Sequence, residues 1–184
     1  MHAEVRRTHP VLDALAGAVG REHVLTDRAE REFHATDVYA SRELPLAVVR
    51  PGTPEEVRRV VQLALDHGLS VVPRGGGASY TDGYLPAEPD ALVVDTGRLD
   101  RIVEINTTDR YVVVEAGVTW ARLHEALSGT GLRTPFFGPF SGIAATVGGS
   151  ISQHSVSWGT GQHGVSAESL LGVEVVTGHG ELLR

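Results

Sequence analysis

Three consecutive glycines, Gly75 to Gly77, are the residues of this chain best suited to chemistry at the backbone. A glycine run loses much conformational entropy on folding, so it is typical of places where φ is positive or where a ligand approaches the main chain. Without Cβ atoms, successive N–H groups can converge into a nest that binds an anion, usually a phosphate. Arg74 before the run, with Ser79 and Tyr80 after it, adds donors for phosphate or sugar oxygens. Residues 74–80, the glycine loop, therefore predict an anion site, with a flexible surface loop as the alternative.

A second glycine-rich region begins at Gly142, where small and hydroxylated residues fill most gaps between glycines. Its hydroxyl, amide and imidazole groups can hydrogen-bond sugar and phosphate without carrying a fixed charge; they belong to Ser150, Ser152, Gln153, His154 and Ser155. The later glycines at 159, 161 and 164 satisfy the G-x-G-x-x-G spacing of dinucleotide-binding folds. That motif requires an apolar strand before it and a helix opening from it, and neither is expected here, so we reject the match.

Several other chemistries are excluded or disfavoured by residue type. The chain has no cysteine, and all 16 basic residues are arginine, which removes thiolate nucleophiles, cysteine-type zinc sites, Schiff-base lysines and the Walker lysine. His154 and His163 lie nine residues apart with no carboxylate at ligand spacing, so no metal site is expected. No G-x-S-x-G elbow is present, which leaves a hydrolase as a weak alternative.

Composition places the chain among ordinary globular proteins. It has 184 residues, 41% hydrophobic and 21% charged, which predicts one domain or slightly more. The net charge of -7 argues against a nucleic-acid partner, because phosphate neutralisation needs a basic surface. No apolar run is long enough to span a membrane or to form a secretory leader, so we expect a cytoplasmic protein without a membrane span.

The glycine loop is expected at the end of a strand–helix–strand unit. Residues 46–50 form the first predicted strand, and Thr53 can cap a helix that begins at Pro54. The apolar stripe of that helix is predicted from Val57, Val60, Val61, Ala64 and Leu65. A second strand over residues 69–72 is expected to stop at Pro73 and to deliver the chain into the loop, the usual α/β arrangement for a phosphate site.

The remaining elements are predicted from the same patterns. Residues 10–19 form an amphipathic helix, whereas residues 27–44 are charged and aperiodic and are expected to connect rather than to fold into an element. Strands over 91–95, 102–105 and 111–115 would add to a mixed sheet, and Thr119 caps a helix that ends near Gly129. Residues 134–140 form an apolar loop that packs or lines a flat ligand, and a strand over 170–176 turns at 178–180 into a last one.

Taken together, the motifs resemble the FAD-binding domain of the vanillyl-alcohol oxidase and p-cresol methylhydroxylase (PCMH) superfamily of flavoproteins. Five pieces occur in order: the PGTPEEV entry, PRGGGASY, VEAGV, TVGG and the closing GVEVVTG. An ordered set is far more specific than one motif. The resemblance covers residues 46–184, after a cover helix and connecting segment in residues 1–45. It implies an α+β, PCMH-type FAD-binding fold in which two small α/β subdomains clasp FAD, the second subdomain being incomplete at the C-terminus.

The resemblance also implies which residues contact the cofactor. The glycine loop would bind the FAD pyrophosphate, Gly117 and Val118 would pass the flavin ring, and residues 146–150, the TVGG segment, would form a second cradle. Further contacts to ribityl and adenosine groups would follow. The implied set is Pro73, Arg74, Gly75, Gly76, Gly77, Ala78, Ser79, Tyr80, Gly117, Val118, Thr146, Gly148, Gly149, Ser150, Ser152, Gln153, Ser155, Gly164, Glu174 and Val175.

Family members continue into a substrate domain, which this sequence does not reach, so no catalytic residue is named and the substrate stays open. The resemblance implies the FAD-binding portion of an FAD-dependent oxidoreductase for a small alcohol, hydroxy acid or sugar-like compound. The alternatives are a non-catalytic flavin-binding fragment or subunit that needs a partner chain, and the related reductase of peptidoglycan precursor synthesis. Exposed apolar residues such as Phe136, Phe137 and Trp158 predict self-association. FAD is expected to be non-covalent, because Ala78 stands where some relatives attach it through histidine.

Overall fold

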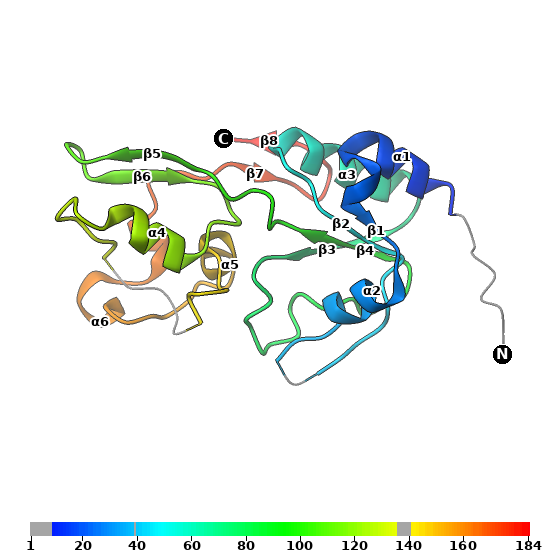
Figure 1. The fold of residues 1–184 in the computed structure, drawn as a ribbon, viewed down its shortest axis with the longest axis horizontal. Helices are drawn as coiled ribbons and strands as arrows, with labels where there is room; N and C mark the ends of the chain where they lie inside the picture. The colour runs from blue at the N-terminus through cyan, green and yellow to red at the C-terminus, as the bar shows by residue number, and fades with distance from the viewer. Residues whose placement is uncertain (1–8, 39, 136–140) are drawn as a thin grey trace.

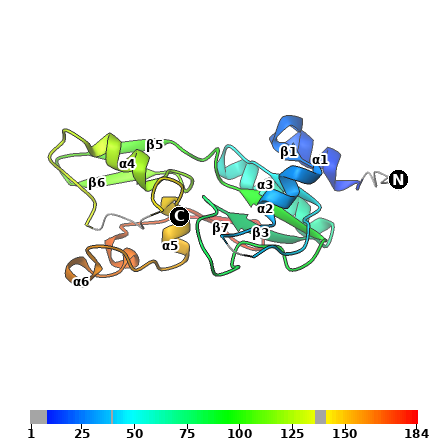
Figure 2. The same ribbon diagram turned by 60° about the horizontal axis from the view of Figure 1, so that its bottom comes forward.

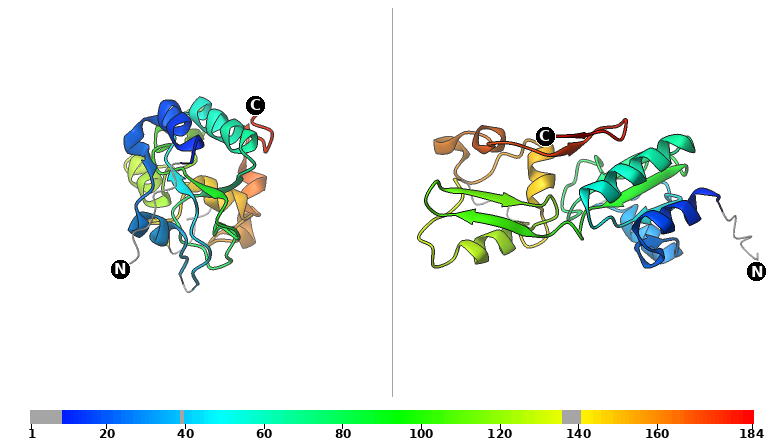
Figure 3. Two further views of the ribbon diagram at one scale, coloured as in Figure 1. Left: turned by 90° about the vertical axis from the view of Figure 1, so that its right-hand side faces the viewer. Right: turned by 90° about the horizontal axis from the view of Figure 1, so that it is seen from above.

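The computed structural model describes residues 9–38, 40–135 and 141–184, which form two lobes side by side (Figure 1). The lobes are also separate in Figure 2 and in the right view of Figure 3, and the chain crosses from the first to the second in the green segment after β4 (Ala91–Asp95). No helix in the described part of the chain is long and apolar enough to cross a membrane.

The first lobe contains a four-stranded sheet with the order β1-β2-β4-β3. The other strands are β1 (Val24–Leu25), β2 (Ala47–Val49) and β3 (Ser70–Arg74); β2, β4 and β3 are parallel, and β1 is antiparallel to β2. Helices α1 (Val11–Val19) and α3 (Pro54–Asp66) cover one face, and α2 (Arg28–His34) lies on the other (Figure 1). Because the parallel strands end at one edge of the sheet, the glycine loop starts beside the ends of β2 and β4.

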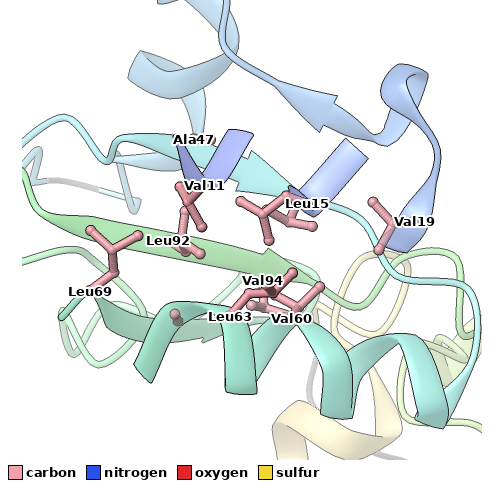
Figure 4. Packing of buried hydrophobic residues seen from close by; sticks show 11 residues of the cluster. Val11, Leu15, Val19, Ala47, Val60, Leu63, Leu69, Leu92 and Val94 are labelled. Carbon is pink, nitrogen blue, oxygen red and sulfur yellow. The ribbon is translucent and has the colours of Figure 1, made fainter. Parts of the chain in front are cut away.

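The core of the first lobe follows from the alternation of side chains along the strands. Alternate residues of β2 and β4, including Val49 and Leu92, point towards α1 and α3, where Leu15 and Val60 are fully buried (Figure 4). The intervening Val48 is buried on the opposite face. Both faces of the central strands are therefore covered, as is typical of a parallel sheet.

The second lobe packs helices against a two-stranded hairpin of β5 (Ile102–Asn106) and β6 (Tyr111–Val114). A register shift between Ile102 and Glu104 allows both Ile102 and Ile105 to face the core despite their odd spacing. Three helices and a 3₁₀ turn complete the lobe: α4 (Trp120–Leu127), α5 (Val147–Ser152), α6 (Thr160–His163) and η2 (Ser166–Ser169).

The last hairpin returns to the first lobe. Strands β7 (Val175–Val176) and β8 (Leu182–Leu183) pair antiparallel, with the turn at residues 178–180 between them. Gly180 at this turn is buried, and its carbonyl accepts a hydrogen bond of 3.4 Å from Nε2 of Gln62 in α3. The hairpin therefore ties residues near the C-terminal end to the helix that precedes the glycine loop.

Most elements expected from the sequence are confirmed. The helix over residues 10–19 is present, and Thr53 and Thr119 each cap a helix through their side-chain oxygen as expected. Thr146 caps α5 in the same way, which was not predicted from the sequence. The hairpin turn at 178–180 is also present. The α+β architecture agrees with the expected fold class. The division of the chain at residue 45 stays a prediction, although α1 packs into the same core as α3.

Five expectations about elements are wrong. The segment 27–44 contains α2, which Asp27 caps; the helix has only seven residues, most of them charged, which is too few to show a helical period. Strand β3 runs through Pro73, because it is an edge strand and the missing N–H costs no ladder bond. The strands form separate sheets rather than one mixed sheet, and strand 170–176 is reduced to β7. In α3, Leu65 is 49% exposed and Leu63 is buried instead.

Candidate cofactor site

The glycine loop presents a row of unused backbone donors. Among the described residues, none of the N–H groups from Gly75 to Tyr80 donates a hydrogen bond to another protein atom. The residues of this stretch are half-buried or exposed. Buried or half-buried N–H groups are normally paired, so an uninterrupted row of them marks a place where an outside acceptor is expected.

The two glycine-rich regions meet in space. A Cβ atom built on Gly75 would lie 2.5 Å from Oγ1 of Thr146, and one built on Gly76 would overlap the carbonyl oxygen of Ala144. Glycine is therefore required at both positions for the two loops to touch. The glycine loop therefore lies next to the TVGG segment, and the prediction that the two contact one cofactor stays a prediction.

The TVGG segment differs from the glycine loop because its N–H groups are already used. The N–H of Val147 donates to the carbonyl of Val118 (2.8 Å), and the N–H of Gly148 donates to the carbonyl of Ala116 (2.9 Å). Gly149 donates to Oγ1 of Thr146 (3.1 Å), the cap of α5. A Cβ on Gly148 would lie 2.7 Å from the Cβ of Ala116. These glycines permit close packing of the protein against itself.

Gly117 is buried in a turn that packs against the chain after β4. Its N–H donates to the carbonyl of Leu99 (2.7 Å), and a Cβ there would overlap the carbonyl of Thr96. Val118 is fully buried in the second core. Gly117 and Val118 thus connect the chain that leaves β4 to the segment that precedes α5.

Arg74 and Tyr84 lie behind the glycine loop. Arg74 is 6% exposed, and its Nη1 donates to the carbonyls of His34 and Thr36, both at 3.2 Å. Its guanidinium lies over the ring of Tyr84, 4.7 Å from the centroid. Burial lowers the pKa of Arg74, although arginine stays charged at any physiological pH. The side chain of Arg74 is thus committed to the protein, and sequence reasoning had no signal for Tyr84.

A half-buried ion network of Asp95, His34 and Arg50 lies at the ends of β2 and β4. Oδ2 of Asp95 lies 3.5 Å from Nε2 of His34 and 3.2 Å from Nε of Arg50, and its other oxygen accepts from the N–H of Gly97 (2.8 Å). Burial by itself raises the pKa of Asp95, but the hydrogen bonds from His34 and Gly97 and the charge of Arg50 outweigh it, so the pKa lies below its ordinary value. The network joins α2 to the sheet beside the glycine loop.

The other expected site residues are more dispersed. Ser150 is buried and its Oγ accepts from Nε1 of Trp120 (2.8 Å), while Ser152 donates back to the carbonyl of Gly148 (2.8 Å). Gln153 is exposed and Ser155 half-buried. A Cβ on Gly164 would overlap the carboxylate of Glu168. Farther on, Glu174 forms an ion pair with Arg184, and Val175 lies in β7.

The apolar residues and the two histidines singled out in the sequence lie apart from the glycine loop or outside the described residues. Phe136 and Phe137 of the apolar loop fall outside the described residues, whereas Trp158 is 65% exposed. His154 is exposed, and Nε2 of His163 is buried without a hydrogen-bond partner among the described residues. No cluster of three or more histidine or carboxylate side chains in the described part of the chain could hold a metal ion.

Comparison with known families identifies the family of this chain. A family model described as an FAD binding domain matches residues 45–184. The chain belongs to this FAD-binding family. FAD carries an anionic pyrophosphate, and the unused N–H groups of the glycine loop fit that group, because they supply donors on a backbone that glycine leaves open.

Curated relatives agree with the family. The chain is 33% identical over 179 residues to D-2-hydroxyglutarate dehydrogenase of Xanthomonas citri pv. viticola, covering 96% of this chain and 37% of that protein. It is 29% identical over 180 residues to glycolate oxidase subunit GlcD of Bacillus subtilis, again covering 96% of this chain and 37% of the relative. The chain therefore spans little more than a third of the length of these FAD-linked oxidoreductases.

Solved structures show the same fold. An alkyldihydroxyacetonephosphate synthase superposes with a TM-score of 0.85 at 20% identity, over 100% of this chain and 36% of that one. p-Cresol methylhydroxylase with substrate bound superposes with a TM-score of 0.70 at 21% identity, over 95% of this chain and 34% of that one. 4-Ethylphenol oxidase from Gulosibacter chungangensis superposes with a TM-score of 0.74 at 27% identity, over 95% of this chain and 34% of that one, and together with the family model it confirms the sequence resemblance to this flavoprotein superfamily.

Proposed function

We propose that the chain is the FAD-binding portion of an FAD-dependent oxidoreductase that acts on a small hydroxy acid, with small alcohols and sugar-like compounds as further classes. The row of N–H groups at Gly75 to Tyr80, none of which donates to a protein atom among the described residues, carries the proposal because it suits an anionic cofactor. The hydroxy-acid class is supported by relatives named for D-2-hydroxyglutarate and glycolate.

Each part of the site has a proposed role. The N–H groups of the glycine loop bind the pyrophosphate, and the TVGG segment, through its bonds to residues 116–118, fixes the backbone that faces the flavin. Exposed Gln153 and half-buried Ser155 are proposed to reach the ribityl or adenosine hydroxyls, with Glu174 and Val175 at the adenine. When bound, FAD supplies a hydride acceptor at its N5 atom. No catalytic residue is proposed among those described.

A non-catalytic flavin-binding module, active only with a partner chain, is the second candidate. A turnover assay with D-2-hydroxyglutarate, glycolate and an artificial electron acceptor distinguishes the two, run on the FAD-loaded chain alone and with candidate partner chains. Oxidation of substrate by the chain alone supports the first candidate. FAD binding with turnover only after a partner is added supports the second. A chain that binds no FAD at all contradicts both.

We also propose that FAD is held without a covalent bond. Ala78 has no nucleophile, and the chain has no cysteine that could attack the flavin. After acid precipitation of the loaded protein, the yellow colour is expected in the supernatant, and the intact mass is expected to be that of the polypeptide. A yellow pellet with the added mass of FAD would overturn this, and His154→Ala and His163→Ala would then locate the bond.

The location and the assembly of the chain remain predictions. We propose a cytoplasmic protein that self-associates through exposed apolar residues such as Trp158, Leu171 and Ile143, which are 65%, 86% and 84% exposed. Light scattering of the purified chain tests the second point. A strictly monomeric species over a wide concentration range would contradict it.

A further inference from the structure

The phenol of Tyr84 bonds to the glycine loop at two places. Tyr84 is only 7% exposed, and its hydroxyl lies 2.8 Å from the carbonyl oxygen of Gly77 and 2.8 Å from that of Ser79. A single O–H has one proton, which these two acceptors share. Two carbonyls of the loop are therefore turned inward, towards the side chain behind it.

The direction of those carbonyls determines the direction of two N–H groups. Every peptide bond among the described residues is trans, so each carbonyl points opposite to the N–H of the next residue in the same planar unit. Since the carbonyl of Gly77 points at Tyr84, the N–H of Ala78 points away from it. By the same reasoning, the N–H of Tyr80 points away because the carbonyl of Ser79 is held. Neither N–H donates to a protein atom.

Arg74 packs against the same stretch of the glycine loop on the side of Tyr84. Its guanidinium packs under Gly77, so closely that a Cβ at that position would overlap Nη2, and Gly77 has a φ of 62°. The guanidinium also stacks on the ring of Tyr84 and is anchored to the carbonyls of His34 and Thr36. The loop therefore packs on two buried side chains, Arg74 and Tyr84, of which Arg74 is fixed to α2 and the residues after it.

We propose that Tyr84 and Arg74 are positioning residues that orient the N–H groups of Ala78 and Tyr80 towards the phosphates of FAD. This inference rests on the proposed role of the glycine loop in binding the pyrophosphate. Tyr84 acts through the loop backbone and needs no contact with the cofactor. The aromatic residue thus contributes to FAD affinity by reducing the number of loop conformations that must be frozen when FAD binds.

The first test uses the unaltered protein. Amide hydrogen exchange is measured residue by residue without and with saturating FAD. The amides of Ala78 and Tyr80 are expected to exchange rapidly in the absence of FAD and to slow strongly in its presence, whereas those of Val147 and Gly148, already bonded to the protein, change little. If FAD is bound but neither Ala78 nor Tyr80 is protected, the inference is overturned. If no FAD binds, the proposed function fails instead.

The second test removes the hydroxyl alone. Tyr84→Phe is expected to raise the Kd for FAD about tenfold, the factor for one lost buried hydrogen bond, and to change the ³¹P resonances of the bound pyrophosphate. The matched control is Tyr111→Phe. It removes a hydroxyl that donates to Oε1 of Glu104 (2.9 Å) in the β5–β6 hairpin, away from the glycine loop. Unchanged Kd and ³¹P signals in Tyr84→Phe would overturn the proposal. A Tyr111→Phe variant with the same tenfold loss would also overturn it, because the effect would then be general.

Arg74→Lys is the third variant and covers the case in which Tyr84→Phe does not fold. Lysine keeps the charge but lacks the planar guanidinium that lies over the Tyr84 ring while its Nη1 donates to both carbonyls. We expect a similar rise in Kd at a temperature where circular dichroism shows the chain to be folded. Wild-type affinity in folded Arg74→Lys would remove Arg74 from the proposal.

Discussion

The glycine loop and the TVGG segment look alike in sequence but differ in how their N–H groups are used. From Gly75 to Tyr80 no N–H has a protein acceptor among the described residues, whereas Val147, Gly148 and Gly149 all donate to the protein. Glycine permits close packing in both regions, but only the first leaves its N–H groups without protein acceptors among the described residues. Glycine content alone therefore does not distinguish the two regions, whereas the use of their N–H groups does.

The two regions are also held in place by different backbone groups. The glycine loop is held through its carbonyls, by the Tyr84 hydroxyl, and from below by Arg74. The TVGG segment is held through its N–H groups, by carbonyls of residues 116 and 118 and by the Thr146 cap. A peptide unit held by its carbonyl leaves its N–H free for a ligand, and one held by its N–H does not.

The largest expected effect comes from a Cβ at the contact between the two regions. Gly76→Ala places a methyl group on the carbonyl of Ala144, so the loops must separate, and FAD binding is expected to be lost. Gly77→Val adds the strain of a positive φ, about 1–2 kcal/mol, to an overlap with Arg74. Flavin absorbance per chain after desalting measures the loss.

The matched control is Gly161→Ala in α6, where nothing lies within 4 Å of the added Cβ. That variant is expected to keep wild-type flavin content and to gain up to about 1 kcal/mol of stability from helix propensity. If Gly76→Ala and Gly77→Val both retain wild-type flavin content, the glycine loop is not the principal cradle and the comparison between the regions fails.

Features set by local sequence were predicted, whereas contacts set by the tertiary fold were not. The glycine run, the caps at Thr53 and Thr119, and the strand over 91–95 are local signals, and each was predicted. Tyr84 was missed because its role depends on a turn that brings it back under residues 77 and 79, which no local period records. Arg74 was assigned to the ligand side because sequence gives a side chain's type but not its direction. The cofactor contacts themselves stay predictions.

A second, smaller effect is expected on the stability of the chain as the pH falls. The glycine loop begins at Arg74, the last residue of β3, which pairs with Asp95 at the end of β4. Burial raises the pKa of the Asp95 carboxyl group, but its ion pairs and hydrogen bonds outweigh this and lower the pKa. A carboxyl whose pKa is lower when folded contributes stability above its unfolded pKa of about 4, and this contribution is lost as the pH falls through the folded value. Asp95→Asn is expected to cost about 2 kcal/mol of unfolding free energy at neutral pH and progressively less below pH 4.

Urea unfolding of both proteins between neutral pH and strong acid tests this. Glu88→Gln, which changes an exposed loop carboxylate, is the control and is expected to shift the unfolding free energy by less than about 0.5 kcal/mol throughout. A constant difference between wild type and Asp95→Asn at every pH would show that the loss comes from packing and not from the ionised carboxylate.

The smallest expected effect lies in the second region and turns on the cap of α5. Thr146 is 5% exposed, and its Oγ1 accepts the N–H of Gly149, so Thr146→Ala removes the acceptor of that half-buried N–H. The expected cost is about 1 kcal/mol of unfolding free energy, close to that of Thr53→Ala, which removes the equivalent cap of α3. Thr146→Ser keeps the oxygen and is expected to restore most of the loss. Because the cap acts on the protein's own backbone, the cost must already be present without FAD, in thermal unfolding of the apo chain. If apo Thr146→Ala melts like wild type and only its FAD affinity falls, the Gly149 N–H belongs to the ligand, and the two regions are cradles of the same kind.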